Sequence, residues 1–266
     1  MISSDFYMGG MLDFSDDISI LKKNNEYDTV PSPYAQFSYD FSDPRLKELT
    51  QVIGLNEIAG TGDDFVKLIK ITFEVAGKLN LGAVADTTSF HALEVFEQTR
   101  DGLVSNCFVT ATVLAECFLS LGYVARMVRC MPIDLRFKDC HCMTIAKVRK
   151  YQKFVAFDAA MGGYYVDSCG IPMGICEIQN ALIQGKDFKI RSIFKIDQQD
   201  IKQYLAKNMV RFQSHKISRY GNEIGDQSTV MINLNPKSLP IANKKYTIRD
   251  RTINDIYIYN KDQFWA

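Results

Sequence analysis

The chain has 266 residues, and its 31 Lys and Arg balance 31 Asp and Glu, so its formal net charge is zero. This balance excludes the basic footprint of a nucleic-acid binder, and no run approaches the ~20 apolar residues that span a bilayer. The first ten residues have no basic stretch followed by an apolar one, so we expect no signal peptide and a cytoplasmic protein. Seven cysteines without the spacing of a disulfide framework fit a reducing compartment.

The N-terminal third predicts an irregular segment followed by helices. Residues 1–44 are polar and aromatic and contain three prolines, which is typical of an irregular lead-in. A short helix is expected over 45–53, and a longer one over 65–80 with Asp63 or Asp64 as its cap. A third helix would run from a Ser89 cap to Thr99.

The middle of the chain predicts one apolar helix and then three strands. The helix begins at Cys107, where Ser105 and Asn106 are good capping residues, and it ends before Gly122. Strands are expected at residues 123–131, 141–148 and 154–158. Gly162 and Gly163 would then turn the chain away from this sheet.

The last hundred residues predict helices over 175–184 and 198–207, with short strands at 229–234, 246–248 and 256–259. We therefore expect a catalytic core over residues 45–186. Residues 187–266 would form a β-rich extension packed on that core, and the whole chain would be one globular unit. The sequence gives no sign of the oligomeric state.

Three residues in this frame form a candidate catalytic triad. Cys107 stands in the first turn of its helix, where the helix dipole favours a thiolate. His141 begins one strand and Asp158 ends the next. If Val148 pairs with Tyr151 across a tight turn, His141 lies directly opposite Asp158, and the carboxylate can orient the ring.

The stretch from about Asp101 to about Gly185 resembles the transglutaminase-like superfamily, the papain-related group of cysteine acyltransferases and proteases, in its bacterial form. The resemblance rests on Asn106-Cys107, on the Gly122 to Arg126 turn into a strand, on Asp139-Cys-His141 and on Phe157-Asp158. It implies an α+β fold in which a helix with an N-terminal cysteine packs on an antiparallel sheet that carries the histidine and the aspartate. It also implies Cys107 as nucleophile, His141 as general base and acid, and Asp158 as the orienting group.

The resemblance leaves the oxyanion donor unassigned. Relatives use an upstream glutamine or tryptophan, and this chain offers only Gln98, while its single tryptophan is Trp265. Backbone N–H groups at the start of the Cys107 helix could supply the donors instead.

Cys140, His141 and Cys142, with Cys130 nearby, raise a zinc hypothesis that we do not favour. Neighbouring strand residues point to opposite faces, so the two cysteines would not share a face with His141. No CxxC pair or second nearby histidine completes four ligands, and we expect neither a metal nor another cofactor.

The remaining polar and cysteine candidates are assigned to structure. His91 would lie on a helix surface or between helices, and His215 would be exposed. Arg126 could bind a substrate carboxylate, but a buried ion pair is the expected role. Cys117 and Cys176 would be small buried apolar residues.

These features predict a cysteine-dependent acyl-group enzyme that acts on a peptide or protein substrate. Attack by Cys107 on an amide carbonyl would give an acyl-enzyme, which water or an amine resolves. The alternative is a catalytically inactive module of the same fold that binds peptides or partner proteins. A second rival is an arylamine-type acetyltransferase with a coenzyme A donor.

Overall fold

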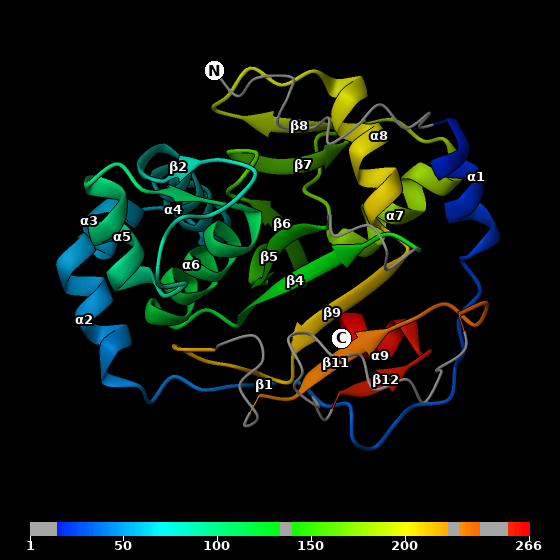
Figure 1. Ribbon diagram of the computed structural model, residues 1–266, viewed down its shortest axis with the longest axis horizontal. Helices are drawn as coiled ribbons and strands as arrows, with labels where there is room; N and C mark the ends of the chain where they lie inside the picture. Colours follow the sequence, from blue (N-terminus) through cyan, green and yellow to red (C-terminus); the bar gives the residue numbers. More distant parts are fainter. Residues whose placement is uncertain (1–14, 134–139, 223–228, 240–254) are drawn as a thin grey trace.

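A computed structural model describes residues 15–133, 140–222, 229–239 and 255–266. Within these ranges the chain is a mixed α+β fold built on one eight-stranded sheet (Figure 1). Its strands lie in the order β12-β11-β9-β4-β5-β6-β7-β8. Neighbouring strands are antiparallel, except for the parallel pair of β11 and β12.

The sheet contains both the predicted strands and several that the sequence did not reveal. Its strands are β4 (Ala125–Met131), β5 (His141–Val148), β6 (Lys153–Asp158), β7 (Gly163–Asp167), β8 (Phe188–Ser192), β9 (Arg211–His215), β11 (Met231–Leu234) and β12 (Ile256–Ile258). Two further parallel pairs join β1 (Ser38–Tyr39) with β10 (Ile217–Ser218), and β2 (Asn80–Leu81) with β3 (Val104–Ser105). The predicted strand at 246–248 lies outside the described residues.

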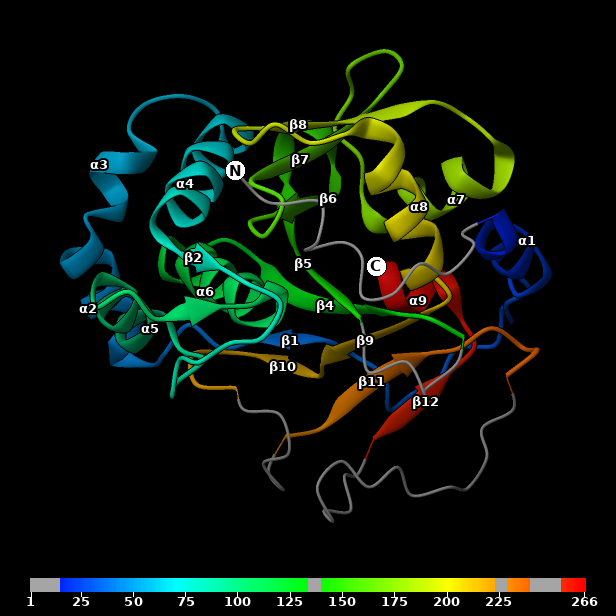
Figure 2. The same cartoon turned by 45° about the horizontal axis from the view of Figure 1, so that its top comes forward.

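Helices cover both faces of the sheet (Figures 1 and 2). One group is α2 (Pro44–Ile53), α3 (Leu55–Ala59), α4 (Asp64–Lys78), α5 (Ala92–Arg100) and α6 (Cys107–Ser120). The other is α1 (Ser15–Lys23), α7 (Ile175–Gln184), α8 (Gln198–Asn208) and α9 (Lys261–Trp265). The helix α1 falls inside the lead-in that we expected to be irregular. A 3-10 turn covers Arg149–Tyr151.

Two apolar cores, one on each face of the sheet, follow from the alternation of side chains along the strands. On β5, Ala146 and Val148 join the core made with α2 to α6. Met143 and Ile145, one residue out of phase, join the core made with α1, α7, α8 and α9. Since β5 is buried on both faces, every residue that it carries except Lys147 is buried.

The Cys107 helix, α6, begins and ends where the sequence indicates. Asn106 is its N-cap, and the Asn106 side chain accepts a hydrogen bond from the backbone N–H of Val109 at 3.1 Å. Gly122, with φ at +79°, follows the end of the helix. Residues 109 to 119 are all buried, so this helix is held in place on every side.

The predicted register between β5 and β6 is wrong by two residues. Val148 pairs with Lys153, and Thr144 pairs with Phe157. The turn is longer than expected because Gln152 adopts the left-handed conformation after the 3-10 turn, with φ at +54°. A shift of two leaves every side chain on its predicted face, so His141 and Asp158 lie diagonally on one face instead of directly opposite.

The expectations for two polar residues and one turn also need correction. His215 is buried in β9, where burial and then the charges of Arg129 and Arg219 lower its pKa to about 3. Gly163 does not turn the chain out of the sheet, because it begins β7 and pairs with Asp158. Helix α5 is capped at His91, and the Ser89 hydroxyl only accepts a hydrogen bond from the His91 N–H.

Gly163 gives a test of this packing. A Cβ atom there would collide with the backbone carbonyl of Arg191 on β8, so Gly163→Ala should lower the free energy of unfolding by about 1–3 kcal/mol. Gly77→Ala is the matched control, since a Cβ inside α4 meets open space and should raise stability by about 0.5–1 kcal/mol. Urea unfolding measures both changes, and an unaffected Gly163→Ala protein would contradict the β6-β7-β8 arrangement.

Candidate active site

Cys107 lies at the N-terminal end of α6, close to the start of β5. The residue is half-buried, and its thiol donates a hydrogen bond to the backbone carbonyl of Cys140 at 3.6 Å. The thiol also interacts with the side chains of His141 and Cys142. The helix therefore brings the sulfur to the beginning of the strand that carries the histidine.

His141 and Asp158 form a buried pair on the sheet face opposite to α6. Nε2 of His141 lies 2.7 Å from Oδ2 of Asp158, and both side chains are completely buried. Nδ1, the other ring nitrogen, is buried without a hydrogen-bond partner among the described residues. The ring also interacts with the Cys107 thiol, and because Nε2 is taken by the carboxylate, Nδ1 is the nitrogen available to the sulfur.

The Asp158 carboxylate is held by two more donors that the sequence did not reveal. The hydroxyl of Tyr165 on β7 donates to Oδ2 at 2.7 Å, and the backbone N–H of Met161 donates to Oδ1 at 3.0 Å. A buried carboxylate is costly unless its oxygens accept hydrogen bonds. With the His141 ring, three groups now contact the two oxygens of Asp158. They fix the carboxylate, and the carboxylate in turn fixes the ring.

Tyr204 from α8 contributes a second unpredicted contact. Its ring packs edge-on against the His141 ring, with centroids 5.2 Å apart. Its hydroxyl donates to the carbonyl of Cys140 at 3.4 Å, the same oxygen that accepts the Cys107 thiol. The C-terminal part of the chain thus encloses the imidazole, although the resemblance covered only residues 101–185.

The electrostatics favour a thiolate beside an imidazolium. The interaction with the Cys142 thiol, together with the neighbouring imidazole of His141 and its charge, lowers the pKa of Cys107 well below its usual range, although burial opposes them. Burial by itself would lower the pKa of His141, but the Asp158 charge and hydrogen bond outweigh it and raise the pKa to about 10. At neutral pH this environment stabilises the charged pair.

The residues considered as oxyanion donors lie elsewhere. Gln98 exchanges hydrogen bonds with Thr88, and Trp265 packs against Phe212 and Phe264 in the opposite core. The first turn of α6 offers backbone donors in their place. Asn106 occupies the N–H groups of Val109 and Thr110, so those of Cys107 and Phe108 have no acceptor inside the helix.

Arg126 and His91 have structural roles. Arg126 is buried, and its guanidinium donates to the Tyr39 hydroxyl and to the Phe264 carbonyl, so the expected ion pair is replaced by neutral acceptors among the described residues. His91 lies between α5 and α6, with Nδ1 3.2 Å from the buried Glu116 carboxylate. The partners of both residues thus belong to the packing of the fold.

The remaining cysteines differ in burial. Cys117 is buried, as expected, whereas Cys176 is only half-buried in the first turn of α7 and interacts with Lys261. In the described ranges, no three His, Cys, Asp or Glu side chains are grouped so that they could hold a metal ion. No helix of those ranges is long and apolar enough to cross a membrane.

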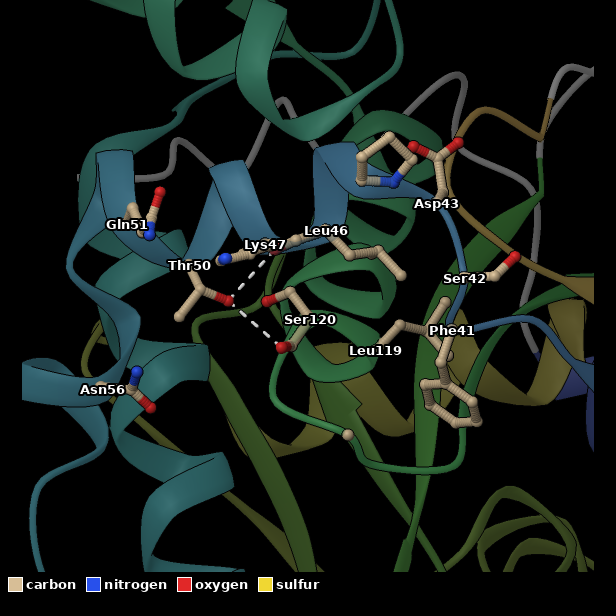
Figure 3. A pocket seen from close by; sticks show the side chains of 12 residues that line it. Phe41, Ser42, Asp43, Leu46, Lys47, Thr50, Gln51, Asn56, Leu119 and Ser120 are labelled. Carbon is tan, nitrogen blue, oxygen red and sulfur yellow. Dashed lines mark hydrogen bonds between the residues drawn. The ribbon is translucent and has the colours of Figure 1, made fainter.

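A surface hollow of about 600 Å³ lies at the other end of α6 (Figure 3). Leu46 and Thr50 of α2 line it together with Ser120, and the Thr50 hydroxyl donates to the carbonyls of Leu46 and Ser120. Since α6 has 14 residues, this hollow is about 20 Å from Cys107. It does not belong to the candidate active site.

Comparison with known proteins leaves the family open. No family model and no curated protein matches the chain. One solved structure that it resembles is described as a "Putative Cysteine Protease" from Cytophaga hutchinsonii, with 18% identity and a TM-score of 0.34. The similarity covers 70% of this chain and 58% of that one, so the chain spans less than two thirds of its neighbour.

Tyr165→Phe tests how the carboxylate is held. The variant keeps the ring, which packs on Phe188, but removes a hydrogen bond to a buried carboxylate, so it should lose about 1.5–3 kcal/mol of unfolding free energy. Tyr164→Phe is the matched control, because the Tyr164 hydroxyl makes no hydrogen bond with the described residues and its ring packs on Phe65. Equal stability of the two variants in urea would contradict this role of Tyr165.

Proposed function

We propose that this chain is a thiol enzyme that cleaves or transfers acyl groups at amide carbonyls, with a transglutaminase-like, papain-related core. Cys107 is the nucleophile, His141 the general acid and base, and Asp158 the orienting group. The observation that carries the proposal is the buried 2.7 Å contact of His141 Nε2 with Asp158, which leaves the remaining ring nitrogen to the Cys107 thiol. Peptides or proteins are the proposed substrates.

The reaction begins with attack by the Cys107 thiolate on the carbonyl carbon. The negative charge that develops on the carbonyl oxygen is stabilised by the N–H groups at the start of α6. Collapse of the tetrahedral intermediate expels the amine, and the His141 imidazolium protonates it as it leaves. The acyl group then remains on the Cys107 sulfur as a thioester, and His141 is neutral.

The second half of the reaction reverses these roles. Neutral His141 accepts a proton from the incoming water or amine, which attacks the thioester and releases the Cys107 thiolate. Asp158 holds the ring by Nε2 throughout, so the proton is exchanged at Nδ1. The choice between hydrolysis and transfer depends on the acceptor, and both use the same intermediate.

One observation favours a different function, a binding module that does not turn over. The His141 and Asp158 side chains are both fully buried. A substrate that enters from solvent therefore does not meet the imidazole that would have to protonate its leaving amine. In such a module the triad would only stabilise the fold. The two functions differ in the reactivity of Cys107, which can be measured without knowing the substrate.

Alkylation by iodoacetamide between pH 5 and 8 tests the thiolate. Because the pKa of Cys107 is lowered and that of His141 is raised to about 10, the rate at Cys107 should stay nearly constant over this range. In His141→Ala the pKa of Cys107 should rise because the interaction with the imidazole and its charge are lost, so the alkylation rate should increase with pH over this range. Peptide mapping assigns each site, and the exposed Cys169 supplies a comparison in the same digest. A wild-type profile that matches His141→Ala would contradict the ion pair.

A burst of p-nitrophenol from an activated ester tests the acyl-enzyme. Wild type should give one equivalent, Cys107→Ala none, and Asp158→Asn a slower burst than wild type but a faster one than His141→Ala, because the carboxylate only orients the ring. Cys169→Ala is the control for loss of a thiol outside the site. Cys107→Ala should also keep its melting temperature, and a large loss of stability would favour a packing role instead. Rapid alkylation without any burst would support the binding module.

A further inference from the structure

Two cysteines beside the candidate nucleophile take no part in the proposed mechanism. Cys142 points from β5 toward α6, where it packs with Ala111, Ala115 and Met127, and Cys107 and Cys140 pack against the same cluster. The Cys142 thiol interacts with the thiols of Cys107 and Cys140. Three thiols from two elements therefore lie together at the start of β5.

The thiol of Cys142 does more than fill space. A residue that is 1% exposed between alanines and a methionine could be another small apolar residue. The interaction of its thiol with Cys107, however, needs a polar hydrogen at this position and supports the thiolate form of Cys107. Hydrogen bonds to Cys107 and Cys140, together with burial, raise the pKa of Cys142 well above its usual range. A thiolate and a protonated thiol thus contact one another.

We propose that Cys142 is the resolving cysteine of Cys107, so that a hydroperoxide converts the two into a reversible disulfide. The proposal rests on the reactive Cys107 of the proposed function, but it does not require turnover of an acyl substrate. Cys142 is assigned this role because it belongs to the cluster against which Cys107 packs and its thiol interacts with that of Cys107, whereas the Cys107 thiol donates a hydrogen bond to the backbone carbonyl of Cys140.

Two steps give the disulfide. The Cys107 thiolate attacks one peroxide oxygen, the O–O bond breaks, and the peroxide is reduced to water or an alcohol while Cys107 becomes a sulfenic acid. The Cys142 sulfur then attacks the Cys107 sulfur, the S–O bond breaks, and the hydroxyl leaves as water with the Cys142 proton. Overall the two thiols lose two electrons to the peroxide. A dithiol reductant returns both residues to thiols.

The consequence is protection of the nucleophile. Without a neighbouring thiol, a sulfenic acid in excess peroxide proceeds to sulfinic acid, which thiol reductants do not reverse. With Cys142 in contact, the second step is intramolecular and competes with further oxidation. The enzyme would be switched off while oxidised and would recover when the oxidant is gone.

The test treats the purified full chain with hydrogen peroxide at pH 7, blocks free thiols and maps the peptides by mass spectrometry. A peptide in which Cys107 is linked to Cys142 is the expected product in wild type and in the control Cys140→Ala. Subsequent dithiothreitol should restore iodoacetamide labelling of Cys107 almost fully in these proteins. In Cys142→Ala, Cys107 should instead reach sulfinic acid, with labelling lost irreversibly; Cys142→Ser provides a second variant of similar size.

The outcomes separate this inference from the proposed function. Wild-type Cys107 that is oxidised to sulfinic acid without the linked peptide, or linked to Cys140, would overturn the role of Cys142 and leave the nucleophile intact. Cys107 that resists both peroxide and iodoacetamide in every variant would overturn the reactive thiol itself, and both proposals with it. The wild-type map decides the question even if a variant does not fold.

Discussion

The hydrogen bond between His141 and Asp158 is the constraint on which the rest of the site depends. Both groups are fully buried, and a buried carboxylate without partners costs several kcal/mol, so this one requires donors on each oxygen. The ring supplies one, and Tyr165 and the Met161 backbone supply two more. The β6-β7 turn is therefore as much a part of the site as the triad, since it places the Met161 N–H and directs Tyr165 back toward Asp158.

The end of β5 lets two faces of the sheet contribute to one site. His141 belongs to the face covered by α8, while Cys107 begins a helix on the other face. In the interior of the strand, the backbone would separate them. At its first residue, the sulfur can pass the strand end, as its 3.6 Å contact with the Cys140 carbonyl indicates. Because β5 begins at His141, the sulfur and the imidazole can meet although they come from opposite faces of the sheet.

The sequence predicts well what is local and poorly what depends on distant contacts. The bounds of β5 and α7 follow from periodicity and glycine, and the N-terminus of α6 follows from a capping asparagine. The register of β5 with β6 was missed because Gln152 adopts a left-handed conformation that no local pattern demands. The exposed position expected for His215 was wrong because β9 is short and polar, and only the strands on either side of it bury it. The contacts of Tyr165 and Tyr204 could not be predicted, since they arise from the folding of β7 and α8 onto the site.

Alternation along β5 also places the two residues that we propose for acyl chemistry and for redox protection on opposite faces of the strand. His141 and Cys142 are adjacent in sequence, yet one contacts Asp158 and the other packs under α6, and both interact with Cys107. A slip of one residue would exchange their faces, placing a thiol against the carboxylate and an imidazole under the helix. The pairing of Thr144 with Met127 and Phe157, together with the hydrogen bond from its hydroxyl to the Ala111 carbonyl, fixes the register against such a slip. The same strand therefore serves the proposed acyl chemistry with its first residue and the proposed redox protection with its second.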